Sequence, residues 1–303
     1  MTIHSIGRPD GPAVLITGAS SGIGRAIAHR LAARGEALVL LARRREELDQ
    51  VALECRQRGS VSTVVLPADV GDAGALERAF ADAVDQLGPI GSVVHAAGIA
   101  GYGRFERIPA HVFDRVLEVN VSGTANVARC ALRHFDDVGL RGNLVLFGSV
   151  VGRISTPYLS PYVTSKWAVR GLTRTLQAEQ SSGGHRISLV EPGGVDTTIY
   201  QKAASYLGVQ GKPPPPVLDA ETVARAAVAL LDRPARQRSV GLLNPLMRFG
   251  FAVVPAVYDR IVGPLMGMLA LDDEPVASHD GNAFEPMAEP RAERIRAGER
   301  TPA

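Results

Sequence analysis

Short apolar runs alternate with longer helical patterns along residues 13–190. The apolar runs are rich in leucine or β-branched residues, and apolar residues recur at helical spacing in the segments between them. The runs at residues 38–41 and 144–147 are apolar at every position, which is typical of central strands buried on both faces. This alternation predicts the α/β fold class, with a doubly wound parallel sheet covered by helices on both faces.

The regular alternation stops after Gly194. Residues 196–217 form a long connection that ends in KPPPP, and connections of this length in compact domains are usually lids or binding loops. Asp219 is a candidate N-cap for a helix that runs to Leu231, and QRSVGLL at residues 237–243 predicts an edge strand. These elements complete a single predicted domain at residues 11–241.

Residues 242–271 are strongly apolar, but Arg248, Asp259 and Arg260 divide them into runs shorter than the ~20 residues that a spanning helix needs. We expect a C-terminal helical extension here, a pair of short helices that packs over the long connection or onto a second subunit. The alternative is a peripheral membrane contact through the same residues. Residues 272–303 contain few large apolar side chains, which predicts a disordered tail.

Composition and charge exclude several kinds of partner. The formal net charge of +2 comes from 33 basic and 31 acidic residues spread evenly, so we expect small-molecule partners and no nucleic acid. Cys55 and Cys130 have neither disulfide nor metal-ligand spacing, and no metal site is expected. The N-terminus lacks the pattern of a secretory leader, which makes a cytoplasmic location the expectation.

A glycine-rich turn, TGASSGIG at residues 17–24, follows the first apolar run and precedes the first helical pattern. Gly18, Gly22 and Gly24 allow backbone amides at the start of a helix to approach a pyrophosphate, which the helix dipole also favours. The context of strand, glycine turn and helix predicts a dinucleotide site. The alternative is a tight turn that binds no ligand.

The second predicted strand ends in three arginines, residues 43–45, where an NAD-binding chain carries an acidic residue for the ribose 2′-hydroxyl. Cations are unfavourable near a helix N-terminus, and a bound phosphate offsets that cost. We therefore predict NADP(H) rather than NAD(H), with Arg43 as the first contact of the 2′-phosphate and Arg44 as the second. The alternative is that Glu46 and Glu47 neutralise a solvated basic cluster.

Tyr162 and Lys166 stand four residues apart in PYVTSKWAVRGL, on one face of a predicted helix. Reducing a ketone requires a proton donor at its oxygen, and oxidising an alcohol requires the reverse. Lowering the pKa of a phenol from about 10 to about 7 requires roughly 4 kcal/mol, of which a cation ~5 Å away supplies about 3 kcal/mol. A Tyr and a Lys four residues apart on a helix often occur without any catalytic function. Here, however, Ser149 lies at the end of the preceding predicted strand and can donate to a developing oxyanion.

Further short motifs occur in order along the chain. They are Asp69 and Val70 after the third predicted strand, HAAG at residues 95–98, Asn120 in NVSG, Ser149 in GSVVG, and PGGVDT at residues 192–197. With the glycine turn and the Tyr162 and Lys166 pair, they resemble the short-chain dehydrogenase/reductase family over about residues 11–241. The resemblance implies a Rossmann fold and an oxidoreductase that transfers hydride between a nicotinamide cofactor and an alcohol or ketone.

The resemblance also implies roles for individual residues. Tyr162 is the general acid/base, Lys166 binds the nicotinamide ribose, and Asn120 holds a water that joins Lys166 to solvent. The implied catalytic residues are Asn120, Ser149, Tyr162 and Lys166. The expected cofactor-binding residues are Gly18, Ser20, Ser21, Gly22, Ile23, Gly24, Arg43, Arg44, Asp69, Val70, Ala97, Gly98, Asn120, Tyr162, Lys166, Pro192, Gly193, Val195 and Thr197.

His95 is a departure from the family pattern, which more often has asparagine at this position. We expect a core histidine whose ring nitrogen replaces an amide hydrogen bond. The resemblance further implies a homodimer or homotetramer formed through the helices that carry Asn120 and Tyr162.

The candidate walls of the substrate pocket are residues 100–105, 150–159 and 199–217. They carry few charges, so we expect a largely apolar alcohol or ketone. Two alternatives remain open, a regulatory protein that binds NADP without catalysis and an epimerase or dehydratase on the same fold. The expected wall side chains are Ile154, Tyr158, Leu159, Tyr200, Tyr206 and Leu207, with Arg104, Arg153 and Lys202 as the charged exceptions.

Overall fold

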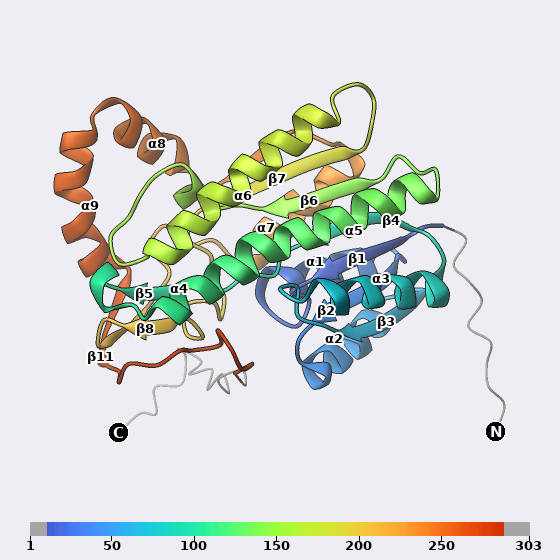
Figure 1. Cartoon of the computed structure of the whole chain (residues 1–303), viewed down its shortest axis with the longest axis horizontal. Helices are drawn as coiled ribbons and strands as arrows, with labels where there is room; N and C mark the ends of the chain where they lie inside the picture. Colours follow the sequence, from blue (N-terminus) through green and yellow to red (C-terminus); the bar gives the residue numbers. More distant parts are fainter. Residues whose placement is uncertain (1–10, 288–303) are drawn as a thin grey trace, which may run out of the picture.

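The computed structural model describes residues 11–287. Seven strands form one sheet in the order β10-β7-β6-β4-β1-β2-β3, and all neighbouring strands are parallel (Figure 1). This doubly wound sheet of the Rossmann type confirms the predicted fold class. The strands are β1 (Ala13–Thr17), β2 (Ala37–Ala42), β3 (Ser62–Pro67), β4 (Ile90–His95), β6 (Asn143–Phe147), β7 (Arg186–Pro192) and β10 (Gln237–Val240).

Helices cover both faces of the sheet, and each face has its own apolar cluster. The side chains of Ala13 and Leu15 in β1 lie in one cluster, whereas those of Val14 and Ile16 lie in the other. Successive strand residues point to opposite faces, so a strand buried on both sides must be apolar throughout. One face carries α3 (Ala73–Leu87), α5 (Gly123–Asp137) and α6 (Ser160–Glu179), and the other carries α1 (Gly22–Ala32), α2 (Arg45–Gln57) and α7 (Ala220–Asp232).

The start of α7 and the join between two other helices follow from local chemistry. Asp219 caps α7 by accepting a hydrogen bond from the backbone N–H of Thr222, as predicted. The helix α4 (Ala110–Leu117) continues into α5 through a π-helical turn, Glu118–Ser122. Such turns often occur at functional sites, and this one carries Asn120.

Two helices, α8 (Asn244–Val253) and α9 (Pro255–Leu269), lie where the sequence predicted a helical extension (Figure 1). They pack beside the long connection between β7 and α7. No helix within residues 11–287 is both long and apolar enough to cross a membrane.

The prediction of a disordered tail from residue 272 onward is wrong for residues 272–287. The strand β11 (Leu271–Pro275) pairs with β9 (Val209–Gly211), and the backbones of His279 and Ser205 exchange two hydrogen bonds. Backbone pairing holds this segment although its sequence lacks an apolar pattern. A further pair of short strands, β5 (Gly101–Gly103) and β8 (Ala204–Tyr206), links the loop after β4 to the same region. Residues 288–303 lie outside the described residues.

Candidate active site

The glycine turn between β1 and α1 packs directly against backbone. A Cβ on Gly18, whose φ is +67°, would lie 2.7 Å from the Ala97 nitrogen, and a Cβ on Gly24 would lie 2.2 Å from the Gly18 carbonyl oxygen. Only glycine fits these two positions. Helix α1 begins at Gly22 without a side-chain cap and without an acidic residue in its first turn, so its first N–H groups suit an anion.

A cavity opens beside this turn, at the carboxyl ends of β1, β2 and β4. Residues from five predicted motifs line it, which are Gly18, Ser20, Ser21, Gly22, Ile23, Gly24, Arg43, Arg44, Asp69, Val70, Ala97, Gly98 and Thr197. The other expected cofactor residues are not among those that line it, namely Asn120, Tyr162, Lys166, Pro192, Gly193 and Val195. This lining, which combines a bare backbone cradle with guanidinium groups, fits a dinucleotide.

Several lining residues were not expected from the sequence. They are Leu41, Ala42, Glu47, Ala68, Ala96, Ile99, Val119, Thr198, Ile199, Lys202, Asn282, Pro286 and Met287. Ile99 and Val119 stand next to motif residues, so a search of motif neighbours finds them. Asn282, Pro286 and Met287 come from the end of the described chain and lack any local sequence signal.

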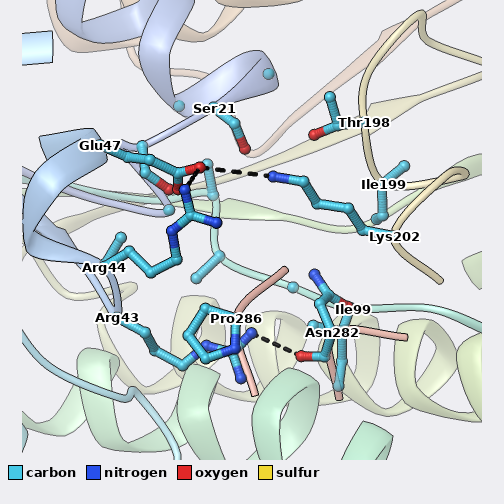
Figure 2. Close-up of a pocket in the computed structure, with 18 of the residues that line it drawn as sticks. Ser21, Arg43, Arg44, Glu47, Ile99, Thr198, Ile199, Lys202, Asn282 and Pro286 are labelled. Carbon is cyan, nitrogen blue, oxygen red and sulfur yellow. Dashed lines mark hydrogen bonds and ion pairs between the residues drawn. The ribbon is translucent and has the colours of Figure 1, made fainter. Parts of the chain in front are cut away.

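Arg43 and Arg44 line the cavity where β2 ends (Figure 2). The Arg43 guanidinium donates to the Asn282 carbonyl at 2.7 Å and to the Ala283 carbonyl at 3.2 Å. Arg44 forms an ion pair with Glu47 and donates to the Met287 carbonyl. Of the two glutamates in the alternative, Glu47 pairs with Arg44, whereas the hydrogen bonds of Arg43 go to carbonyl groups.

Asp69 is fixed by an arginine that the motifs did not reveal. Its carboxylate accepts from the Gly71 backbone at 2.9 Å and forms an ion pair with Arg115 of α4. Arg115 also donates to the Ala283 carbonyl at 2.9 Å. Burial lowers the pKa of Arg43, the Asp69 carboxylate raises it, and the Arg115 charge lowers it. Arg43 and Arg44, from the connection between β2 and α2, thus line the cavity, and Arg115 of α4 stands behind Asp69.

The four expected catalytic residues are brought together between β6, the π-helical turn and α6. Lys166 donates from Nζ to the Phe147 carbonyl at 2.9 Å and lies 5.5 Å from the centre of the Tyr162 ring. Ser149 follows β6 and forms a hydrogen bond with Tyr162. Asn120, Ser149 and Lys166 are all buried.

Gly98 connects the catalytic group to the cavity. A Cβ on Gly98 would lie 3.2 Å from Asn120 Oδ1 and 3.8 Å from Lys166 Nζ, and Gly98 itself lines the cavity. The ammonium and the cavity therefore meet at a position that must stay free of a side chain.

The protonation of Tyr162 differs from the prediction. Burial raises the pKa of the phenol, Tyr200 raises it further, and the hydrogen bond from Ser149 offsets a part. Burial also lowers the pKa of the Lys166 ammonium to about 8. From the sequence, the ammonium of Lys166 was expected to supply most of the shift of the phenol toward pKa 7. In this structure burial is the largest effect on the pKa of Tyr162, and it acts in the opposite direction.

Asn120 fixes the loop after β4. Its Oδ1 accepts from the Ile99 N–H at 2.9 Å, and its Nδ2 donates to the Ile99 carbonyl and to Ser165 Oγ, each at 2.9 Å. The side-chain amide is thus engaged by protein groups. The role of Asn120 in holding a relay water stays a prediction.

His95 is a core histidine with both ring nitrogens bonded, as predicted. Nδ1 lies 2.7 Å from Thr17 Oγ1 and Nε2 lies 3.0 Å from Thr124 Oγ1. These bonds join β1, β4 and α5. Burial, and to a smaller extent the charge of Lys166, lower the pKa of His95 to about 3, which keeps the ring neutral.

Apolar side chains surround Tyr162 on the side away from the glycine turn. Tyr162 packs against two buried clusters, one with Leu159 and Tyr102 and the other with Val150 and Ile154. Of the expected wall residues, Ile154, Leu159, Tyr200 and Leu207 belong to these clusters. The helices α8 and α9 add side chains that the sequence did not identify individually, which are Met247, Phe251, Tyr258, Val262 and Met266.

Other expected wall residues serve different contacts. Tyr206 donates to Asp280, and Arg153 donates to the buried Glu191 carboxylate at 2.8 Å. Lys202 lies 3.9 Å from Glu47 at the rim of the dinucleotide cavity (Figure 2). The surroundings of Tyr162 are therefore more apolar than the sequence indicated.

Comparison with known proteins gives consistent matches. The family model described as short chain dehydrogenase matches residues 12–207. The chain is 28% identical over 262 residues to the uncharacterized oxidoreductase YxnA of Bacillus subtilis, covering 84% of this chain and 72% of that protein. It is 36% identical over 190 residues to the NADPH-dependent pterin aldehyde reductase of Arabidopsis thaliana, covering 61% of this chain and 76% of that protein. One similar solved structure is an alcohol dehydrogenase of the archaeon Thermococcus sibiricus complexed with 5-hydroxy-NADP. It aligns with a TM-score of 0.67 and 31% identity, covering 76% of this chain and 95% of that chain.

Proposed function

This chain belongs to the short-chain dehydrogenase family, and from that premise we propose that it interconverts an apolar alcohol and its carbonyl compound with NADP(H). The chain is an oxidoreductase of a family that uses nicotinamide cofactors. The observation that carries the proposal is the placement of Gly98, which lines the dinucleotide cavity and lies beside Asn120 and Lys166. The cofactor, when bound, supplies or accepts the hydride.

Tyr162 is the proton donor and acceptor of the proposed reaction. Because burial raises the pKa of its phenol, Tyr162 is protonated at neutral pH and is ready to donate to a carbonyl oxygen. Ser149, which forms a hydrogen bond with Tyr162, donates to the same substrate oxygen and fixes its position.

Lys166 supports Tyr162 by holding a positive charge in a buried place. With a pKa of about 8, Lys166 is cationic at neutral pH, and its ammonium lies 5.5 Å from the Tyr162 ring centre. The charge stabilises the phenolate that forms as Tyr162 gives up its proton. The bond from Nζ to the Phe147 carbonyl keeps the ammonium in place, and Nζ retains two further donors for the cofactor ribose and a water.

The preference for NADP(H) rests on the end of β2. Arg43 and Arg44 line the cavity there, and the first acidic side chain on the lining, Glu47, is paired with Arg44. A guanidinium fork matches a phosphate better than a ribose hydroxyl. The names of two relatives support the preference, since one is an NADPH-dependent reductase and the other was solved with an NADP analogue.

A substrate panel tests the proposal. Apolar ketones and aldehydes are offered to the wild type with NADPH and with NADH, and consumption of the reduced cofactor is followed. We expect turnover with NADPH at a kcat/KM at least tenfold above that with NADH, and Arg43→Met should remove most of the difference. Equal efficiency with the two cofactors contradicts the NADP(H) assignment, and absence of turnover across the panel favours a regulatory protein.

A further inference from the structure

The outer face of α8 and α9 exposes many large apolar side chains. Phe249 is 60% exposed, Leu246 66% and Met268 74%. Most of the exposed large apolar side chains of residues 11–287 lie on this pair of helices and the residues before it, namely Leu242, Leu243, Leu246, Phe249, Val253, Val254, Val257, Ile261, Leu265 and Met268. A monomeric soluble protein rarely exposes an apolar patch of this kind, so the patch indicates an interaction site.

The inner face of the same helices is already used. Phe251 and Tyr258 pack against the cluster of Val150 and Ile154, and the Tyr258 hydroxyl donates to the Ser155 carbonyl at 2.9 Å. These contacts fix the orientation of the hairpin, which therefore presents its outer side chains in a defined way. Figure 1 shows α8 and α9 at the end of the molecule opposite α2 and α3.

The charges near the α8 end of the apolar face are mostly positive. Residues 242–271 contain Arg248, Arg260 and one carboxylate, Asp259, whereas the acidic residues 272–274 follow the other end of the hairpin, after α9. Arg248 of α8 also lies close enough to Arg170 of α6 for their charges to interact. Burial lowers the pKa of Arg170, and the nearby charges of Arg153, Arg248 and Arg174 lower it further, against an opposing effect of Glu191. The arginines at the α8 end complement an anionic partner.

Trp167, the only tryptophan of the chain, marks the edge of the face. Its ring centre lies 6.2 Å from that of Phe251 in α8, its Nε1 donates to the Ile154 carbonyl at 3.2 Å, and the side chain is partly exposed. An amphipathic ring beside an apolar face and arginines is typical of a protein surface at a membrane interface.

We propose that the outer face of α8 and α9 docks on an anionic lipid bilayer, with its apolar side chains in the interface and Arg248 and Arg260 at the headgroups. A protein interface usually includes about ten hydrogen bonds, and the hairpin offers a protein partner only three charged side chains for them, Arg248, Asp259 and Arg260. Lipid requires no such bonds. If the proposed function holds, an apolar substrate reaches Tyr162 from the bilayer, because the inner face of the hairpin borders the Tyr162 clusters.

Vesicle cosedimentation with the full chain tests this docking. Probes are vesicles of phosphatidylcholine alone and of phosphatidylcholine with phosphatidylglycerol. We expect binding to the anionic vesicles, a loss of at least tenfold in Leu246→Ser/Phe249→Ser/Ile261→Ser, and a loss of the anionic preference in Arg248→Gln/Arg260→Gln. The matched control is Leu53→Ser, because Leu53 is 47% exposed in α2, at the end of the molecule opposite the hairpin (Figure 1), and this variant should bind as the wild type does.

Light scattering after size exclusion separates lipid from a second copy of the chain. Wild-type binding to neither kind of vesicle overturns the proposal. It is also overturned if the triple serine variant changes the oligomeric state while vesicle binding stays the same, since the face is then an interface between copies. Equal thermal unfolding of the variants excludes misfolding as the cause of lost binding.

A second inference rests on a different observation, the contacts of residues 279–287 across the dinucleotide cavity. Asn282 donates from its backbone to the Lys202 carbonyl at 2.8 Å, and Asp280 accepts from Tyr206. Ala283 is 1% exposed and belongs to the same cluster as Val70, Ile99 and Val119, which line the cavity. This segment, which we name the C-terminal strap, is thus tied down along its length.

The strap takes the donors that a 2′-phosphate would use. Arg43 donates to the carbonyl of Asn282 (Figure 2) and to that of Ala283, and Arg44 donates to that of Met287. The cavity has a volume of about 180 Å³. Ligand pockets usually measure about 300–1,000 Å³, so a dinucleotide requires the strap to move.

We infer that the C-terminal strap competes with the 2′-phosphate for Arg43 and thereby sets the affinity for NADP(H). The inference rests on the proposed function. A phosphate forms charge-assisted hydrogen bonds that are stronger than those of a neutral carbonyl, which allows it to displace the strap. A ligand without this phosphate gains less from Arg43 and displaces the strap less readily.

Calorimetric binding of adenosine 2′,5′-bisphosphate and of adenosine 5′-monophosphate tests the competition without any turnover. Ala283→Leu overfills the buried Ala283 site and should release the strap. We expect at least fivefold tighter binding of the bisphosphate and a smaller gain for the monophosphate. Glu285→Gln, at an exposed strap position, is the matched control and should bind as the wild type does.

Hydrogen exchange supplies the second readout. The amides of Asn282 and Ala283, which are bonded to the carbonyls of Lys202 and Asp280, should exchange faster when the bisphosphate is bound. The competition is overturned if the bisphosphate leaves the exchange of these amides unchanged and Ala283→Leu binds it with wild-type affinity. This holds even if Arg43→Met abolishes selectivity for the bisphosphate. If Arg43→Met has no effect on that selectivity, the NADP(H) assignment itself fails.

Discussion

Burial determines the charge of two bases near the catalytic group, Lys166 and His95. Each has a lowered pKa, about 8 for Lys166 and about 3 for His95, and desolvation is the largest cause in both. Lys166 nevertheless remains cationic at neutral pH, because a shift from an ordinary value near 10.5 leaves it above 7. His95 is neutral at the same pH. The fold thus keeps one positive charge next to Tyr162 and excludes a second.

The buried ammonium of Lys166 makes stability depend on alkaline pH. Between pH 8 and about 10.5 the unfolded chain binds more protons at this site than the folded one, so stability rises with pH in this window. The free energy of unfolding of the wild type should therefore rise by on the order of 3 kcal/mol from pH 7 to pH 10.5 through this group, and Lys166→Met should lack this rise. Urea unfolding at both pH values measures this difference. A constant difference between the two proteins contradicts the assigned pKa.

His95 has the opposite consequence on the acid side. Its folded pKa is below the unfolded value of 6.5, so the unfolded chain binds the extra proton and stability falls as the pH drops from 6.5 toward 3. Between pH 7 and pH 4 we expect the free energy of unfolding to fall by on the order of 3 kcal/mol less in His95→Asn than in the wild type. Unfolding monitored by circular dichroism at the two pH values checks this, and parallel losses in the two proteins would count against a neutral His95.

Sequence reasoning reached the catalytic residues but not their energetics. Lys166 and Tyr162 are one helical turn apart, and this spacing is visible in the sequence. The Phe147 carbonyl that holds Lys166 and the Tyr200 phenol that opposes ionisation of Tyr162 come from other elements, and no local pattern identifies them.

At the scale of the element, the glycine turn and the π-helical turn set the geometry of the site. The glycine turn brings bare backbone to the cavity, and the π-helical turn directs Asn120 to the loop after β4. Both elements depend on contacts that a larger or differently placed side chain would break.

Gly24→Ala tests the close packing of the glycine turn. An alanine Cβ would lie 2.2 Å from the Gly18 carbonyl oxygen, so the turn must shift. We expect NADPH binding to weaken at least 100-fold and stability to fall by about 1–3 kcal/mol. The matched control is Gly171→Ala in α6, where a Cβ meets nothing within 4 Å and helix propensity should add up to about 1 kcal/mol. Fluorescence titration with NADPH would refute the prediction if the two variants bound equally well.

The elements that the sequence predicted are those with a local signal. Residues 38–41 and 144–147 form central strands because both faces of the sheet bury them. β11 and the C-terminal strap escaped prediction because backbone pairing with Val209 and Ser205, distant in the sequence, holds them in place. Ala283 fits its buried site because its side chain is small. An alanine in a segment with few large apolar residues gives no sequence signal that separates a buried position from a disordered tail.

At the scale of the whole molecule, the C-terminal residues wrap around both sides of the site. α8 and α9 border the apolar surroundings of Tyr162, and the strap then crosses to the arginine end of the dinucleotide cavity. Residues that lie outside the sequence motifs of the family thus shape both the substrate side and the cofactor side.

The oligomeric state stays a prediction at this scale. We expect a homodimer or homotetramer formed through α5 and α6, whose helices lie side by side along one face of the sheet (Figure 1). Light scattering after size exclusion should give a mass of two or four chains, and Leu246→Ser/Phe249→Ser/Ile261→Ser should leave it unchanged. A monomeric wild type would contradict this expectation.

The central claim is that Tyr162 protonates a carbonyl oxygen while hydride arrives at its carbon. Deuterium transfer tests it most directly, with NADPH deuterated at the transferred position, an apolar ketone and mass spectrometry of the alcohol. We predict one deuterium per alcohol molecule for the wild type and a rate at least 10²-fold lower for Tyr162→Phe, with NADPH binding retained. Deuterium transfer by Tyr162→Phe at the wild-type rate, or alcohol without deuterium from the wild type, would contradict the account.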